Sequence, residues 1–140
     1  MIYKSLDGLI LTAVIGGSPV IAQEDTVSDY PIIGTWMSEC DAWGTAAVCT
    51  SIWRIGEHPS HLVQQYAIVG KENGDKLFAG RGVYRILGES VSGYWEDSQG
   101  AIHPLAGVNK DATIEVIWGT PGKEMGRSSY AHHDGKLLVR

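Results

Sequence analysis

Residues that favour tight turns recur every few positions along this chain, and their spacing limits the folds that it can adopt. Glycine makes up 18 of the 140 residues, roughly twice its usual share of ~7%. Glycine and asparagine accept positive φ and proline fixes φ, so clusters of them predict turns. The clusters lie at residues 41–44, 56–59, 73–75, 88–90, 98–100, 107–109, 120–122 and 134–135. Links this short permit β-hairpins but not the helical crossovers that parallel strands need.

The segments between these turns alternate as half-buried β-strands do. Leu62, Gln64 and Tyr66 would share one strand face, with Val63 and Val69 on the other. The expected strands cover residues 33–39, 47–55, 61–69, 76–87, 90–97, 101–106, 112–118, 123–132 and 136–140. This pattern predicts an all-β fold, an antiparallel up-and-down meander closed into a small barrel of about eight to nine strands. Closure removes the exposed sheet edges that otherwise invite aggregation.

The first 22 residues have the layout of a secretory signal peptide. Lys4 supplies a positive start, residues 9–15 are apolar, and residues 16–19 would break a helix ahead of a cleavage site at 20–22. The apolar run is too short to span ~30 Å of hydrocarbon; an uncleaved anchor or an N-terminal strand is the alternative. We expect a signal peptide at 1–22, a polar lead-in at 23–31 and one barrel domain at 32–140. The protein would then be periplasmic or secreted.

The charge balance argues against two classes of partner. The formal net charge is −5 and the sequence pI is about 5.4. Nucleic-acid binding depends on lysine and arginine neutralising phosphates, and the chain has no basic cluster of that kind. An acidic surface is also repelled by anionic lipid headgroups. We therefore expect neither nucleic acid nor a membrane surface as a partner.

Cys40 and Cys49 are the two cysteines of the chain. In an exported protein they would meet an oxidising compartment, and their spacing allows a bridge between two strands across a hairpin loop. A loop of this size predicts a stabilisation of roughly 2–3 kcal/mol from the disulfide. Two thiols without further ligands at suitable spacing do not make a zinc site. A disulfide is the prediction, and a pair of buried thiols is the alternative.

The motif Gly34-Thr35-Trp36 at the start of the first expected strand resembles the G-x-W opening of the calycin superfamily, which contains lipocalins, fatty-acid-binding proteins and avidins. The resemblance implies that Trp36 plugs the closed end of the barrel, with Gly34 beside it in a structural role. It also implies that a late arginine, here Arg127, packs over the indole. Residues 80–84 and 93–100 resemble small exported bacterial domains of lipocalin-like fold. No helix is expected after the last strand, unlike in true lipocalins.

A barrel of this size is either filled by its own side chains or holds one small ligand. Trp36, Trp53, Tyr66, Trp95 and Trp118 could wall a pocket or could make the core, and the sequence leaves both open. The preferred function is the binding of a small, partly apolar molecule. The expected ligand-binding residues are Tyr66, Tyr84, Trp95 and Arg127. The loops at 56–60 and 98–103 are expected at the open end.

Catalysis and metal binding are the alternatives considered for the polar residues. Asp97 and His103 lie on either side of an expected hairpin and could form a cyclase or isomerase site, with Glu39 as a further carboxylate. A carboxylate beside a histidine and an indole could be a base with a raised pKa; Asp97 could equally cap its own turn. His58 and His61 could hold a metal only with a distant third ligand, and His132 and His133 point to opposite faces of their strand. We therefore expect surface histidines and neither metal nor cofactor, with a metal or haem site as the alternative. A third alternative is a solid barrel that meets a protein partner through its outer surface.

Overall fold

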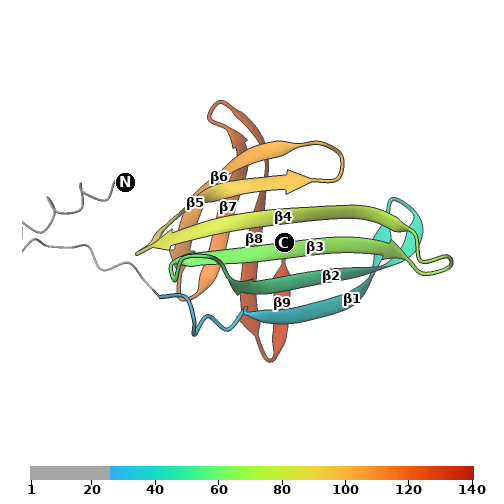
Figure 1. Ribbon diagram of the computed structural model, residues 1–140, viewed down its shortest axis with the longest axis horizontal. Helices are drawn as coiled ribbons and strands as arrows, with labels where there is room; N and C mark the ends of the chain where they lie inside the picture. Colours follow the sequence, from blue (N-terminus) through green and yellow to red (C-terminus); the bar gives the residue numbers. More distant parts are fainter. Residues whose placement is uncertain (1–25) are drawn as a thin grey trace, which may run out of the picture.

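The computed structural model describes residues 26–140 as a single nine-stranded antiparallel sheet without helices (Figure 1). The expected signal peptide at 1–22 and the first residues of the lead-in lie outside the described part. No helix among residues 26–140 is long and apolar enough to cross a membrane. The strands are β1 (Gly34–Ala42), β2 (Thr45–Ile55), β3 (His61–Gly70), β4 (Lys76–Leu87), β5 (Ser90–Asp97), β6 (Ile102–Lys110), β7 (Thr113–Thr120), β8 (Lys123–His133) and β9 (Lys136–Val139).

Each strand pairs with the next along the chain, so the predicted up-and-down meander is confirmed. The sheet curls into a nearly closed barrel with one unsealed seam, because β1 pairs with β2 and β9 pairs with β8 but the two outer strands do not pair with each other. The indole of Trp36 on β1 and the ring of His132 on β8 lie 5.7 Å apart between centroids. A side-chain contact therefore bridges this part of the seam where backbone hydrogen bonds do not.

One end of the barrel is closed by a packed core and by the lead-in. Val27 is fully buried, and its N–H donates to the carbonyl of Pro59 at 3.0 Å. The Asn109 side-chain amide donates to the hydroxyl of Tyr30 at 2.7 Å. The buried side chains that pack at this end are Val27, Ile32, Trp53, Leu62, Tyr84, Ile86, Val91, Leu105, Ile114, Val116 and Tyr130. The loop at 56–60 joins β2 to β3 beside this core, whereas the turn at 98–101 is at the opposite end. The expectation that both loops sit at the open end was therefore wrong.

A second correction concerns residues 107–109, which were expected to form a turn. They continue strand β6, and the chain reverses instead at Asp111 and Ala112, which have φ values of 51° and 59°. A Cβ on Gly107 would lie 1.9 Å from the carbonyl oxygen of Glu115. The glycine is thus needed because two strands approach closely and not because the chain turns there.

Candidate functional site

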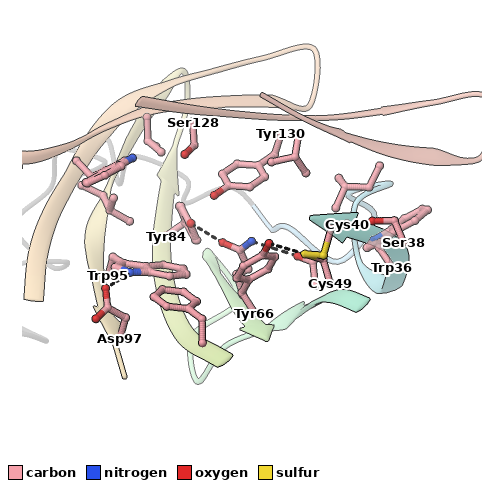
Figure 2. Close-up of a pocket in the computed structure, with 18 of the residues that line it drawn as sticks. Trp36, Ser38, Cys40, Cys49, Tyr66, Tyr84, Trp95, Asp97, Ser128 and Tyr130 are labelled. Carbon is pink, nitrogen blue, oxygen red and sulfur yellow. Dashed lines mark hydrogen bonds between the residues drawn. A yellow bond between two sulfur atoms is a disulfide. The ribbon is translucent and has the colours of Figure 1, made fainter. Parts of the chain in front are cut away.

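The interior of the barrel is hollow and forms a cavity of about 1050 Å³ that side chains from all nine strands line. Side chains therefore leave this part of the interior open. Figure 2 shows the rings of Tyr66, Tyr84, Trp95 and Tyr130 around the open space. The aromatic members of the lining are Trp36, Tyr66, Phe78, Tyr84, Trp95, His103, Trp118 and Tyr130.

Glycines on the inner face explain why large aromatic side chains do not fill the cavity. A Cβ on Gly80 would lie 2.1 Å from the Trp95 ring, and one on Gly126 would lie 2.5 Å from the Trp118 ring. Each indole thus occupies the place that a side chain on the neighbouring strand would take, and it lies against the wall instead of crossing the interior. Small serines add to the space, since Ser38, Ser51 and Ser128 also line the cavity.

A chain of hydrogen bonds runs along the wall of the cavity near its closed end (Figure 2). The Tyr84 hydroxyl donates to Gln64 Oε1 at 2.7 Å, and Gln64 Nε2 donates to Ser51 Oγ at 3.1 Å. All three side chains are buried from the outer surface of the protein, and all three line the cavity. Because Ser51 Oγ accepts in this chain, its own O–H can still donate to a ligand acceptor. The apolar cavity thus has a small polar patch at its base.

Burial raises the pKa of Tyr84 well above its ordinary value of 10.0, and the neighbouring Tyr130 adds to the shift. The pKa of Tyr66 is raised as well, mainly by burial and also by the effect of Tyr130. Both phenols are therefore neutral donors over the physiological range. Ionisation of Tyr84 would place an anion inside an apolar barrel, which is costly.

Replacing Tyr84 with phenylalanine should change the alkaline stability of the protein in a defined direction. A group whose folded-state pKa is raised contributes stability that is full below its unfolded pKa and is lost as pH rises through the folded value. We therefore expect the wild-type melting temperature to fall above about pH 10, and the fall to be shallower in Tyr84→Phe. At pH 7 the variant should be less stable by about 1–2 kcal/mol, because Gln64 Oε1 loses its donor. Thermal melts between pH 7 and 12 test this, and equal alkaline slopes would contradict it.

Asp97 lies at the open end of β5, where its carboxylate caps the turn that follows. Its Oδ1 accepts from the backbone N–H groups of Gln99 at 2.9 Å and Ala101 at 3.3 Å. Its Oδ2 accepts from Trp95 Nε1 at 3.1 Å (Figure 2). Burial alone would raise the pKa of this carboxyl, but these hydrogen bonds and the nearby His103 outweigh it, so the pKa is lowered. The expected raised-pKa base was therefore wrong, whereas the expected turn cap is present.

The structure brings three of the four expected ligand-binding residues to the cavity. Tyr66, Tyr84 and Trp95 line it, and so do the two catalytic candidates, Asp97 and His103. Arg127 does not, and its expected place in the lining was wrong. The reason is the strand alternation: Ser128 and its next-but-one neighbour Tyr130 face inward on β8, so Arg127 faces outward and is exposed.

Trp36 lies near the closed end, as its motif implied, and packs against the core. Its Nε1 donates to the Ile32 carbonyl at 2.8 Å, and Gly34 beside it has a φ of 148°. The ring that contacts its indole is that of His132, and the expected contact with Arg127 is absent because that residue faces outward.

Several lining residues were not singled out from the sequence. Phe78 and Tyr130 belong to the aromatic wall, and Gln64 with Ser51 supplies its polar patch. The alternation of inward- and outward-facing residues along a strand could have identified them. Phe78 faces the same side of β4 as Tyr84, and Gln64 faces the same side of β3 as Tyr66. Which of the two alternating sets of residues on a strand faces inward could be recognised only after one inward residue on that strand was known.

The remaining polar candidates lie away from the cavity. Among residues 26–140, no group of three or more histidine, cysteine, aspartate or glutamate side chains is placed to hold a metal ion. The rings of His58 and His61 lie 5.1 Å apart at the closed end. Glu39 is exposed on the outer face and forms an ion pair with Lys71 at 2.5 Å, so it does not join a catalytic group with Asp97.

The predicted disulfide between Cys40 and Cys49 is present and links β1 to β2 near the open end. The two Cα atoms are 5.9 Å apart, and both residues line the cavity. The Tyr66 hydroxyl lies 3.2 Å from the sulfur of Cys49. A disulfide of this kind is consistent with an exported protein or another oxidising compartment.

The nearly closed nine-strand antiparallel barrel is compatible with a calycin-like fold. No known family model matches the chain, and no curated protein is significantly similar to it. The cavity and its side chains are therefore the basis for assigning a function.

Proposed function

We propose that the chain is an exported, lipocalin-like barrel that binds one small, partly apolar molecule in its interior. The observation that carries this proposal is the cavity of about 1050 Å³ inside the barrel. Ligand sites are typically concave spaces of about 300–1,000 Å³ with apolar and aromatic walls and a few polar groups. A barrel without a ligand would gain stability from a packed interior, so the glycines that keep this one hollow favour a binding role.

The chemistry of the wall supports a ligand that is apolar over most of its surface. Tyr66, Trp95 and Trp118 offer ring faces, and the polar groups are confined to the patch around Gln64 and the rim at Asp97. A ligand with one hydroxyl or carbonyl could bond to the patch while its body contacts the rings. The polar contacts would fix its orientation, and the buried apolar area would supply most of the affinity.

Two further observations support the proposed calycin-like fold and the proposed export of the protein. Trp36 of the G-x-W motif packs at the closed end of the barrel, where the family resemblance implies a plug, with His132 in contact where an arginine was expected. The disulfide suits the oxidising periplasm or the exterior, in keeping with the signal-peptide layout of residues 1–22. We therefore place the protein in the periplasm or among secreted proteins.

Catalysis by Asp97 and His103 has weaker support than binding. A general base needs a pKa near the working pH, whereas the hydrogen bonds that Asp97 accepts and the nearby His103 keep its pKa lowered. Turnover on a small molecule would be abolished by Asp97→Asn if this alternative held, whereas a purely binding role predicts no turnover to lose.

Native mass spectrometry of the protein purified from the cells that produce it tests the proposal. We expect a retained small molecule, with one bound per chain, that dissociates on unfolding. The neutral apolar dye N-phenyl-1-naphthylamine supplies a second readout, because its fluorescence rises when it leaves water. If no molecule is retained and the dye does not bind, the proposed function is wrong.

Filling the cavity should abolish dye binding without unfolding the barrel. Ser128 lines the cavity and is half-buried, so Ser128→Phe places a ring in the space that a ligand would use. We expect at least a tenfold loss of affinity for the dye in a fluorescence titration. The matched control is Ser129→Phe, because this neighbour faces away from the cavity; its affinity should stay within about twofold. Equal losses in the two variants would contradict binding inside the barrel.

A further inference from the structure

Building on the proposed function, we infer that the cavity selects an organic cation. The apolar body of the ligand would lie inside the barrel, and its ammonium group would sit at the open end against the Asp97 carboxylate and the face of Trp95. This inference narrows the class of ligand, and it can fail while the proposed function stands.

The distribution of charge around the cavity is the first support. Among the described lining residues, Asp97 is the only carboxylate and Lys136 the only ammonium group. They belong to opposite ends of the barrel, because β5 ends at Asp97 at the open end whereas Lys136 follows the β8–β9 turn at the other end. Lys136 is exposed, so water screens its charge. At the open end, the one formal charge among the described lining residues is therefore negative.

The hydrogen bonds of Asp97 leave room for a ligand donor. A carboxylate has about four lone-pair sites. Gln99, Ala101 and Trp95 occupy three of them, two on Oδ1 and one on Oδ2. The second site on Oδ2 can accept an N–H from a ligand, and the three protein bonds hold the carboxylate in place. Because the pKa of Asp97 is lowered, the carboxylate is charged at neutral pH.

Aromatic rings lie near the same carboxylate, and Trp95 presents its N–H edge to it. The Trp95 ring that donates to Asp97 stacks on Phe78, with 6.5 Å between centroids and an angle of 12° between planes. On the next strands the His103 ring contacts Trp118 at 5.7 Å. A cation within about 6 Å of a tryptophan face is attracted by the ring quadrupole. Ring faces beside a fixed carboxylate form a site that favours an ammonium group over a neutral one.

The same arrangement disfavours the other charge classes. A carboxylate ligand would place two like charges together at the rim of the cavity, which lowers its affinity most at low salt. A neutral ligand could donate a hydrogen bond to Asp97 but would lack the attraction between opposite charges. His103 also lines the cavity on this rim.

Three probes with one apolar body separate these cases: 2-(2-naphthyl)ethylamine, 2-(2-naphthyl)ethanol and 3-(2-naphthyl)propanoate. Isothermal titration calorimetry of the full mature chain at pH 8 and low salt measures each affinity. We expect the amine to bind about tenfold more tightly than the alcohol, and the carboxylate to bind more weakly than either. Equal affinity for all three would overturn the inference and leave the proposed function standing. Failure of all three to bind would overturn the inference, and the proposed function would fall with it only if N-phenyl-1-naphthylamine also fails to bind and no molecule is retained.

Asp97→Asn removes the charge and keeps a carbonyl oxygen that can accept from Gln99 and Ala101. The tenfold preference for the amine should disappear, while the affinity for the alcohol should change by less than about threefold. Glu96→Gln is the matched control, because it removes a carboxylate from the adjacent, outward-facing position, where Glu96 is 3.9 Å from Arg81. This control should keep the preference. If Asp97→Asn retains it, or Glu96→Gln loses it equally, the assignment to Asp97 is wrong.

Discussion

Gly93→Ala should destabilise the barrel by about 3 kcal/mol or more, although it adds only one methyl group. A Cβ at this position would lie 1.8 Å from the carbonyl oxygen of Val83 and 2.8 Å from its carbonyl carbon. These are backbone atoms of the adjacent strand β4, so no side-chain rotation can relieve the contact. The two strands would have to separate where Tyr84 pairs with Gly93. Urea denaturation monitored by tryptophan fluorescence measures the loss of free energy of unfolding.

Gly88→Asn is the control for this prediction. Gly88 lies in the turn between β4 and β5 with a φ of 60°, and a Cβ there would meet nothing within 4 Å. Asparagine tolerates this left-handed backbone conformation better than other side chains do, so we expect a change of less than about 1 kcal/mol. If Gly93→Ala were as stable as Gly88→Asn, the close approach of β4 and β5 would not be a requirement of the fold.

The fold could be predicted from the sequence because its two signals, turns and alternation, are local. The strand expected at 76–87 is β4 as the structure has it, and the strand expected at 90–97 is β5. The turn predicted at 107–109 was wrong because glycine is needed both in turns and where two strands approach each other closely. Gly107 serves the second purpose beside Glu115, and nothing local distinguishes the two uses.

The hollow interior could not be predicted because it depends on which strands become neighbours. Gly80 leaves room for Trp95, and Gly126 for Trp118, only because β4 pairs with β5 and β7 with β8. Once that pairing is known, a glycine opposite an inward aromatic residue indicates a ring lying against the wall. The same knowledge places Arg127 outside, since one inward residue on β8 sets the phase of all the others.

The seam between β1 and β9 also could not be predicted from local sequence patterns. An alternating pattern shows that a segment forms a strand but not whether its outer edge finds a partner. β9 has four residues, whereas β1 has nine, so a full ladder between them is impossible. The contact of Trp36 with His132 instead joins β1 to β8, and this pairing depends on the curl of the whole sheet.

Removing the disulfide should cause the second large loss of stability. The bond closes a loop with a sequence separation of 9, for which the chain-entropy account gives about 2–3 kcal/mol. It ties the open-end halves of β1 and β2 together, and β1 is the strand whose other edge lies at the seam. The double variant Cys40→Ala/Cys49→Ala should therefore unfold at lower urea concentration, with a melting temperature lower by about 8–12 °C.

Dithiothreitol provides the control for the disulfide prediction. It should lower the stability of the wild-type protein to about that of the double variant, and it should leave the double variant unchanged. Both cysteines line the cavity without supplying a charge, so the affinity for N-phenyl-1-naphthylamine should change by less than about threefold at temperatures where the variant is folded. A loss of less than about 1 kcal/mol would mean that pairing between β1 and β2 already holds the unsealed edge. In that case the bond would not be what keeps the open end of the barrel in shape.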